Sequence, residues 1–371
     1  MLREVALLFL KLGTIGFGGP AAHIAMMRQE VVERRRWLSE AEFLDLLGAA
    51  NLIPGPSSTV LAIHVGLRLC GWRGLLVAGA CFILPAALMV TAIAAAYVRF
   101  HTLPQVAGVM YGIKPVVVAI VAQAVWNLGR ASLRGWLLRF VAGAAVLMTA
   151  LGDEQIVTLL ACGAVVTVVR MPRSLALWIP GALIGGGLAV SEPVTLSRLF
   201  WVFVKIGAVV FGSGYVLLAF LQADLVTHLH WLNATELLDA VAVGQVTPGP
   251  VFTTATFIGY LAAGMPGAAV ATLGIFLPGW ILVALSGPLL PRVRRSVVGS
   301  AFLDGVTAAS VGLIAWVLLL LGKAALVDVI TLAIVLVSVG LLFRYRVNAA
   351  WLVLLGGLVG LLCTSIKQHQ I

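Results

Sequence analysis

The most constraining feature of this sequence is an internal duplication. Residues 9–56 align without a gap to residues 203–250, at an offset of 194, and both segments end in Pro-Gly-Pro. FLKLGTIGFGG falls on FVKIGAVVFGS, and WLSEAEFLDLL falls on WLNATELLDAV. Shared apolar composition does not explain a shared Lys, Trp, Glu, Asp and PGP. The chain is therefore predicted to be two copies of one unit, 1–170 and 198–371, joined by a linker segment, 171–197.

Composition places both copies in a membrane. The chain is 61% hydrophobic and 10% charged, whereas a soluble domain carries roughly 25% charged residues. The prediction is an all-α polytopic membrane protein. Its net charge of +10 comes largely from short arginine clusters between apolar segments, which is typical of cytoplasmic loops and not of nucleic-acid binding. The four cysteines have neither disulfide nor metal-ligand spacing, so no metal or cofactor is expected.

The arginine clusters also predict how the two copies are oriented. The first copy is positive at 28–36 and 130–139, and the equivalent loops of the second copy are poor in Lys and Arg. The second copy is instead positive at 292–295 and 344–346. Because positive loops stay in the cytoplasm, this bias predicts two repeats inserted with inverted topology. A multi-pass protein of the bacterial cytoplasmic (inner) membrane is expected.

The PGP motifs are predicted to break helices within the membrane. The apolar segments on either side of each motif, 41–53 with 57–69 and 235–247 with 250–263, are each too short to span a bilayer. Each pair therefore forms either a re-entrant hairpin or one long broken helix. The arginine distribution favours re-entrance, and in that case segment 175–190 does not fully cross.

Broken helices in inverted repeats are typical of secondary transporters, whose substrates bind near the bilayer midplane. Hydroxyl residues follow each PGP, beside free N–H groups at the positive end of a new helix, which is a ready anion site. These predicted anion-binding hydroxyl residues are Ser57, Ser58, Thr59, Thr253 and Thr254. The glycine breaks at 16–20 and 211–215 form a second pair, with Ser213 and Tyr215 as further donors.

Matched lysines and acids are the next candidates. Lys11 and Lys205 occupy equivalent positions inside apolar segments, where a lysine either serves function or extends to the interface. Asp45 and Asp239 are candidate proton carriers, with a salt bridge to the lysines as the alternative. Glu42 has capping-box spacing from Ser39, which favours a structural role.

Three further polar groups are open between function and structure. His23 and His64 have no histidine counterpart in the second copy; His64 is a candidate for proton coupling and His23 for substrate binding, with a structural role as the alternative for each. Asn51 and its counterpart Gln245 precede the breaks, where an amide can satisfy freed backbone or bind substrate. Lys114 and Asp304, on equivalent segments, are considered as an ion pair between the copies.

At GFGGPAAHIAMM, NLIPGPSSTVLAIHVGLRLCGWRG, VFGSGYVLLAFL and VGQVTPGPVFTTATFIGY, the chain resembles the chromate ion transporter family in its long, two-domain form. The resemblance implies export of chromate, driven by the membrane potential or a proton gradient, with sulfate as a competitor. The motif residues that it implies are Gly18, Gly19, Pro20, His23, Asn51, Pro54, Gly55, Pro56, Gly212, Gly214, Tyr215, Gln245, Pro248, Gly249 and Pro250.

The residues alone predict a secondary transporter for a small anion, and chromate comes only from the resemblance. A transporter of sulfate or another oxyanion is the first alternative. A membrane enzyme acting on a phosphorylated lipid is the second, and it would need an acid–base cluster at one membrane face. The expected partners are chromate or sulfate, membrane lipid and, as a further option, a second copy of the chain.

Overall fold

The computed structural model describes residues 1–100, 103–170, 194–211, 214–286, 297–345 and 347–368, and the described part is helical throughout its regular structure. The first half contains seven α-helices and a π-helical turn, η1. They are α1 (Leu2–Ile15), α2 (Gly19–Arg28), η1 (Gln29–Arg34), α3 (Glu40–Ala50), α4 (Ser57–Phe100), α5 (Pro104–Ser132), α6 (Trp136–Ala150) and α7 (Gln155–Arg170). The predicted segment 175–190 lies outside the described residues.

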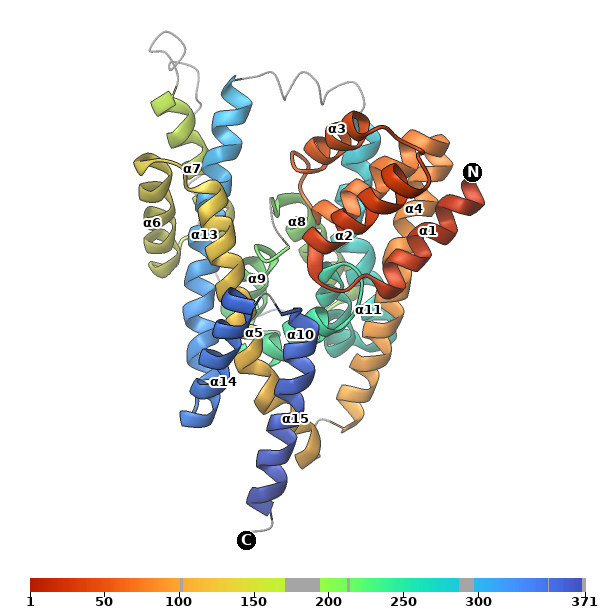
Figure 1. The fold of residues 1–371 in the computed structure, drawn as a ribbon. Coiled ribbons are helices and arrows are strands. Elements are labelled where there is room, and N and C mark those ends of the chain that lie inside the picture. Colours follow the sequence, from red (N-terminus) through yellow and green to blue (C-terminus); the bar gives the residue numbers. More distant parts are fainter. Residues whose placement is uncertain (101–102, 171–193, 212–213, 287–296, 346, 369–371) are drawn as a thin grey trace.

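The second half repeats this order. Its described elements are α8 (Leu196–Val209), α9 (Leu217–Leu221), the π-helix η3 (Gln222–His228), α10 (Ala234–Val246), the 3₁₀ turn η4 (Val251–Thr253), α11 (Thr254–Ser286), α13 (Val297–Ala325), α14 (Val329–Gly340), the π-helix η5 (Leu341–Tyr345) and α15 (Ala349–Gln368). In Figure 1, α5, α6, α7, α13 and α14 form one group, and α1 to α4 with α11 form another, with α8 to α10 between them.

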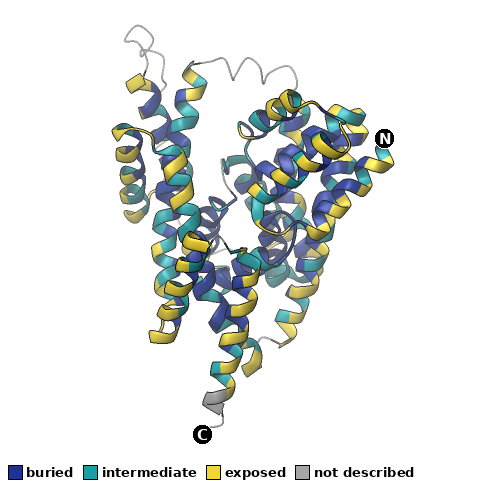
Figure 2. Ribbon diagram, in the orientation of Figure 1, coloured by how far each residue is buried: buried dark blue, intermediate teal, exposed yellow. Residues whose placement is uncertain are grey.

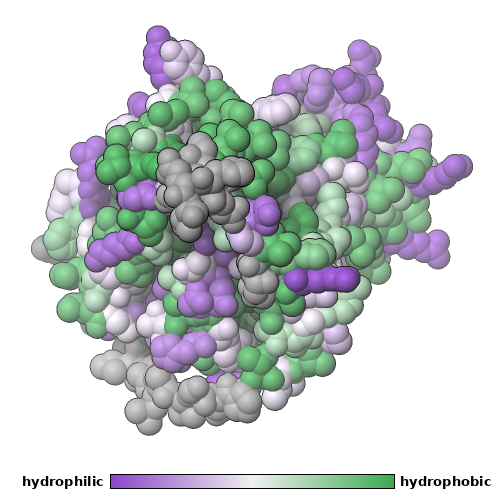
Figure 3. Space-filling view, turned by 90° about the horizontal axis from the view of Figure 1, so that it is seen from below, coloured by the Kyte–Doolittle hydropathy of each residue, from purple (hydrophilic) through white to green (hydrophobic). Residues whose placement is uncertain are grey.

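The surface is that of a membrane protein. Four helical stretches of the described chain are long and apolar enough to cross a bilayer: Ser57–Phe100, Pro104–Ser132, Val251–Leu285 and Val298–Ala325. Large apolar side chains point outward, such as Trp136 at 77% exposure, and the exposed positions in Figure 2 follow the outer faces of the helices. Seen end-on, hydrophilic side chains also gather toward the middle of the molecule, between hydrophobic patches (Figure 3). The prediction of an all-α polytopic membrane protein is confirmed.

Both long helices α4 and α11 contain a sharp turn. Cys70 and Gly71 leave the helical conformation in α4, and Ala263 and Gly264 do so in α11. The two glycines have φ of +60° and +63°, a region that favours glycine because it has no Cβ. The chain then doubles back, so that Gly66 packs directly against the backbone of Gly74. The cause of each sharp turn is therefore a glycine in this region of positive φ.

The chain also folds back at the first PGP. Arg68 Nη2, at the end of the first limb of α4, lies 2.8 Å from Glu42 Oε1 in the first turn of α3. In one continuous broken helix these residues would lie about 39 Å apart, at 1.5 Å per residue. The segment is therefore a hairpin, as the arginine distribution favoured. In the second half, the Thr254 side chain packs against Gly244 across the second PGP.

Equivalent local contacts recur in the two halves. Ser39 with Glu42 caps α3, and Asn233 with Glu236 caps α10, both as complete capping boxes. The capping role expected for Glu42 is confirmed. The turns before these caps also match, because Arg36 and His230 both have φ of 52°.

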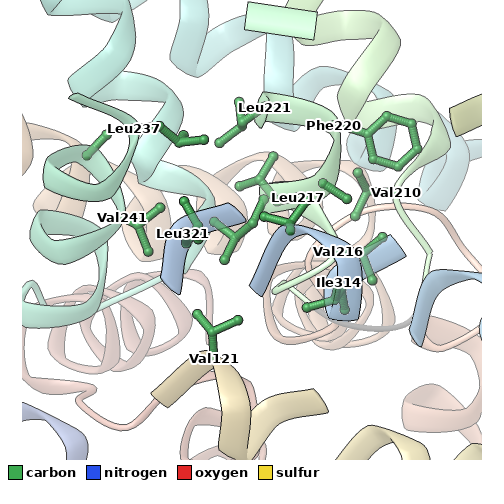
Figure 4. Close-up of a cluster of buried hydrophobic side chains, with 14 of the residues drawn as sticks. Val121, Val210, Val216, Leu217, Phe220, Leu221, Leu237, Val241, Ile314 and Leu321 are labelled. Carbon is green, nitrogen blue, oxygen red and sulfur yellow. The ribbon is translucent and has the colours of Figure 1, made fainter. Parts of the chain in front are cut away.

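The core does not follow the division of the sequence into halves. Helix α13 packs against α6 and α7 of the first half, and α5 packs against α14 and α15 of the second. The largest cluster of buried apolar side chains combines both halves, with Leu217, Phe220, Leu237, Val241 and Ile314 near its centre (Figure 4). The predicted units 1–170 and 198–371 thus share the larger core cluster, and a second cluster belongs almost entirely to the first unit.

Candidate functional site

The glycines of the two PGP motifs make a crossed pair of backbone hydrogen bonds. The N–H of Gly55 donates to the carbonyl of Val210 at 2.7 Å, and the N–H of Gly249 donates to the carbonyl of Gly16 at 2.8 Å. Gly55 and Gly249 are equivalent in the duplication, as are Gly16 and Val210. Each PGP loop is therefore hydrogen-bonded to the glycine break of the other half. Such reciprocal contacts between equivalent residues are typical of a two-fold interface.

His23 supports this junction. Its Nε2 lies 2.8 Å from the Gly16 carbonyl, and its Nδ1 lies 3.4 Å from Ser58 Oγ. Because a carbonyl only accepts, Nε2 carries the donated proton. The ring is 1% exposed and packs edge-on against Phe82. The structure thus places His23 between the glycine break and the two limbs of α4, with contacts at both ring nitrogens.

Next to this junction lies a cavity of about 620 Å³, which we call the amide cavity. Its polar lining side chains come from both halves of the chain: Gln123, Asn127, Arg130, Tyr215, Gln245, Thr247 and Asn348. Among its described lining residues there is one cation, Arg130, and no carboxylate. The Tyr215 hydroxyl lies 3.5 Å from Gln245 Oε1, and Gln245 Nε2 is a buried donor without a described hydrogen-bond partner. This chemistry suits an anion.

The structure brings several of the predicted residues to the amide cavity. Gly18, Gly19, Tyr215, Gln245 and Gly249 line it. Pro20 is the second residue of α2 beside them, and its missing N–H suits the first helical turn. In the break at 211–215, Gly214 is buried and lies next to Val251 and Phe252. Gly212 and Ser213 lie outside the described residues.

Sequence reasoning missed the residues that α5 and the start of α15 contribute. Gln123, Asn127 and Arg130 lie on α5, and Asn348 precedes α15. By sequence, Arg130 belongs to the positive loop at 130–139. A usable signal was present, because Gln123, Asn127 and Arg130 recur at spacings of four and three residues on one helical face.

The hydroxyls that follow the PGP motifs lie elsewhere. Ser57, Ser58, Thr59, Thr253 and Thr254 are each at most 6% exposed, and none lines a described cavity. Thr253 and Thr254 donate to the carbonyls of Pro250 and Val251 at 2.8 Å, inside their own turn. The prediction placed these groups at a shared pocket; the structure places them in the packed interior beside it.

The remaining motif positions shape the hairpins. Pro54 and Pro56 flank Gly55 and stop α3 from continuing into α4. Pro248 and Pro250 do the same around Gly249 between α10 and η4. Asn51 is the C-cap of α3 and is exposed; it lines neither described cavity, unlike its counterpart Gln245.

The two lysines have carboxylate partners that differ from those considered. Lys11 Nζ lies 2.9 Å from Glu30 Oε1, and Lys205 Nζ lies 2.9 Å from Asp224 Oδ1. Neither lysine lines a described cavity. The considered salt bridges of these lysines to Asp45 and Asp239 are therefore wrong. The π-helices η1 and η3 place Glu30 and Asp224 within ion-pair distance of Lys11 and Lys205 instead.

The candidate proton carriers occupy three different environments. Asp45 is exposed on α3. His64 is 6% exposed, and its Nε2 has no hydrogen-bond partner among the described residues. Asp239 forms an ion pair with Lys114, at 3.1 Å. The considered pair of Lys114 with Asp304 is wrong, because Asp304 instead contacts Arg170 at the end of α7.

In the described part of the chain, no group of three or more His, Cys, Asp and Glu side chains is placed to hold a metal ion. The amide cavity and the apolar outer surface define the class of this protein: a multi-pass helical membrane protein with a polar cavity lined by both halves of the chain. Comparison with known proteins then gives its family. The family described as "Chromate transporter" matches residues 3–186 and 197–361. The chain therefore belongs to the chromate transporter family.

Full-length relatives agree with this assignment. The chain is 36% identical to the chromate transport protein of Cupriavidus metallidurans, over 99% of this chain and 94% of the relative. It is 36% identical to the probable chromate transport protein of Synechococcus elongatus, over 91% and 88%. It is 30% identical to the chromate transport protein of Pseudomonas aeruginosa, over 95% and 90%. No solved structure matches significantly.

Proposed function

We propose that this protein is a secondary active transporter that exports chromate across the bacterial cytoplasmic membrane, and that the amide cavity is its substrate site. The observation that carries the proposal is the lining of that cavity. One guanidinium, several amides and a tyrosine hydroxyl face it, and its described lining contains no carboxylate. The family and the names of the relatives support chromate as the oxyanion and transport as the activity.

The chemistry of the cavity fits a tetrahedral dianion. The Arg130 guanidinium supplies charge and several N–H donors in a fixed geometry. Gln245 Nε2 supplies a donor that is buried without a described partner, and an unpaired buried donor costs about 1–3 kcal/mol until a ligand accepts from it. Substrate binding would recover that free energy.

The crossed hydrogen bonds of the PGP glycines support a second part of the proposal. We take the halves as inverted repeats related by a pseudo-two-fold axis, with the substrate at their interface. Alternating access then arises when one repeat rocks against the other around a fixed site. Helix α5 packs against α14 and α15, and α13 packs against α6 and α7. These are the contacts between the halves that would change during such a motion.

The driving force belongs to the proposal as well. Export driven by the proton gradient or the membrane potential fits a dianion, because an inside-negative potential favours its exit by about 2.3 kcal/mol per charge per 100 mV. A proton-coupled mechanism would use a buried titratable group, and of the three candidates Asp45, Asp239 and His64, the last two are buried.

Sulfate is the alternative substrate, because it has the same charge and shape and the lining donors do not distinguish the two anions. The test is flux into proteoliposomes containing purified protein, with labelled chromate and labelled sulfate under an imposed pH gradient or potential. Flux of chromate in preference to sulfate supports the proposal. Flux of sulfate alone favours the alternative, and flux of neither anion overturns an oxyanion transport role.

Arg130 gives the site-directed form of this test. We expect Arg130→Gln to raise the half-saturating chromate concentration about 10-fold or more, because a hydrogen bond to a charged group contributes about 1.5–3 kcal/mol. Arg134→Gln is the matched control, since Arg134 is exposed in the loop after α5 and does not line the cavity. Equal effects of the two substitutions would show that the amide cavity is not the binding site.

A further inference from the structure

A second cavity, of about 340 Å³, lies at the other end of α5, and we call it the tyrosine cavity. Its described polar lining consists of Tyr97, Tyr111, Lys114, Thr235 and Asp239. Lys114 is its one cation and Asp239 its one carboxylate among the described lining residues. The sequence indicated Lys114 and Asp239 separately, and the structure brings them together here with parts of α4, α5, α10 and the end of α13.

The two cavities are arranged along the same two helices. Helix α5 lines the tyrosine cavity with residues 106–114 and the amide cavity with residues 120–130. Helix α10 lines them with Thr235 and Asp239, and with Gly244 and Gln245. At 1.5 Å per residue, Lys114 and Ile120 are about 9 Å apart along the helix. The cavities are therefore successive chambers along one axis.

The stretches of α5 and α10 between the residues that line the two chambers are apolar and buried. On α5, Val116, Val117 and Ala119 are at most 1% exposed. On α10, Val241 and Ala242 are likewise at most 1% exposed. A barrier of buried small side chains between two polar chambers is the arrangement expected of a closed path, because a small movement of α10 against α5 would join them.

The ion pair at the tyrosine cavity is costly to bury. The side chains of Lys114 and Asp239 are 15% and 4% exposed. Lys114 Nζ lies 3.1 Å from Asp239 Oδ1, and the Tyr97 hydroxyl donates to Asp239 Oδ2 at 2.8 Å. Burying such a pair contributes little net stability compared with apolar residues of similar size. A charged pair inside a membrane protein is by default a functional feature.

The geometry points to a second anion site, in which Lys114 is the binding cation and Asp239 is an internal carboxylate that occupies Lys114 while the site is empty. This inference rests on the proposed transport function. An oxyanion that passes the barrier would displace the carboxylate of Asp239 from Lys114. Tyr97 would keep its hydrogen bond to Asp239 during the exchange, so that the released carboxylate retains a donor.

The pair joins the two halves and has no symmetry-related counterpart. The duplication places Thr307 opposite Lys114, and Asp45 opposite Asp239. Asp45 is exposed, whereas Asp239 is 3% exposed. The second site therefore breaks the symmetry of the duplicated chain, and it would serve one side of the membrane.

The test compares binding with flux in the full-length protein, using labelled chromate. We expect Lys114→Gln to lower flux about 10-fold or more, while equilibrium binding at the amide cavity changes less than about 2-fold. Lys323→Gln is the matched control, because Lys323 is exposed near the end of α13 and lines neither cavity. Asp239→Asn removes the competing carboxylate and should lower the half-saturating chromate concentration.

A neutral pair separates this role from a structural one. Lys114→Gln combined with Asp239→Asn leaves no unpaired buried charge, so a merely structural ion pair predicts recovery of folding and of flux. The inference predicts recovery of folding without recovery of flux, because the binding cation is still missing. Wild-type flux in the double variant, or in Lys114→Gln alone, overturns the inference. It would leave the proposed function intact, since that depends on wild-type flux and on Arg130.

Discussion

At the scale of single residues, the two PGP glycines differ in the space around them, and Gly249 has less room for a side chain than Gly55. A Cβ built on Gly249 would lie 2.6 Å from the Cβ of Ala86 and 3.1 Å from the carbonyl oxygen of Gly13. At Gly55 the nearest such atom, in Val60, is 3.5 Å away. Both glycines have positive φ, 94° and 118°. The equivalent positions thus share a backbone requirement and differ in available space.

We therefore expect Gly249→Ala to destabilise the protein more than Gly55→Ala. The positive φ alone costs about 1–2 kcal/mol for an alanine, and overpacking adds about 1–3 kcal/mol at Gly249 only. Thermal unfolding of the purified variants in one detergent measures the difference. Equal loss of stability would show that the close approach of Gly249 to α4 and α1 is not maintained.

Among the helical elements, α4 and α11 each contain a glycine turn. The doubled-back turn at Gly71 in α4 has its counterpart at Gly264 in α11. A Cβ on Gly71 would meet no atom within 4 Å. Glycine is therefore required there by backbone conformation, whereas Gly66 is required by the close approach of the two limbs. Gly71 thus serves the turn itself, and Gly66 serves the packing of the limb before it against the limb after it.

Gly71→Ala tests the backbone requirement without a steric contribution. We expect a loss of about 1–3 kcal/mol, because a non-glycine residue in this region is strained. Gly143→Ala is the control, since Gly143 lies within α6 with no atom near its built Cβ. That change should stabilise α6 by about 0.5–1 kcal/mol. A neutral Gly71→Ala in denaturant titrations would contradict the turn geometry.

On the scale of the whole molecule, the two halves hold one another. Gly112 of α5 packs on the backbone of Gly356 in α15, and Gly305 of α13 packs on Cys162 and Gly163 in α7. These close approaches are again equivalent in the duplication. Because the last helices of each half pack against the other half, the larger of the two described core clusters contains residues from both.

The predicted inverted topology of the two halves can be tested by cysteine accessibility. In a background without the native cysteines, Glu33→Cys and Thr227→Cys place thiols at equivalent exposed positions of η1 and η3. An impermeant thiol reagent should label one site in intact cells and the other only in inverted vesicles. Labelling of both from the same side would exclude inverted repeats, whatever the substrate.

The sequence by itself determined the membrane class, the duplication, the helix breaks and the family, because composition, glycine and proline act locally along the chain. It also indicated Gly18, Gly19, Tyr215, Gln245 and Gly249, which line the amide cavity. Only the tertiary structure decided that Arg130 joins them, that Lys205 pairs with Asp224, and that Lys114 pairs with Asp239. These contacts bring together helices distant in the sequence, and local patterns carry no record of which distant helices will pack.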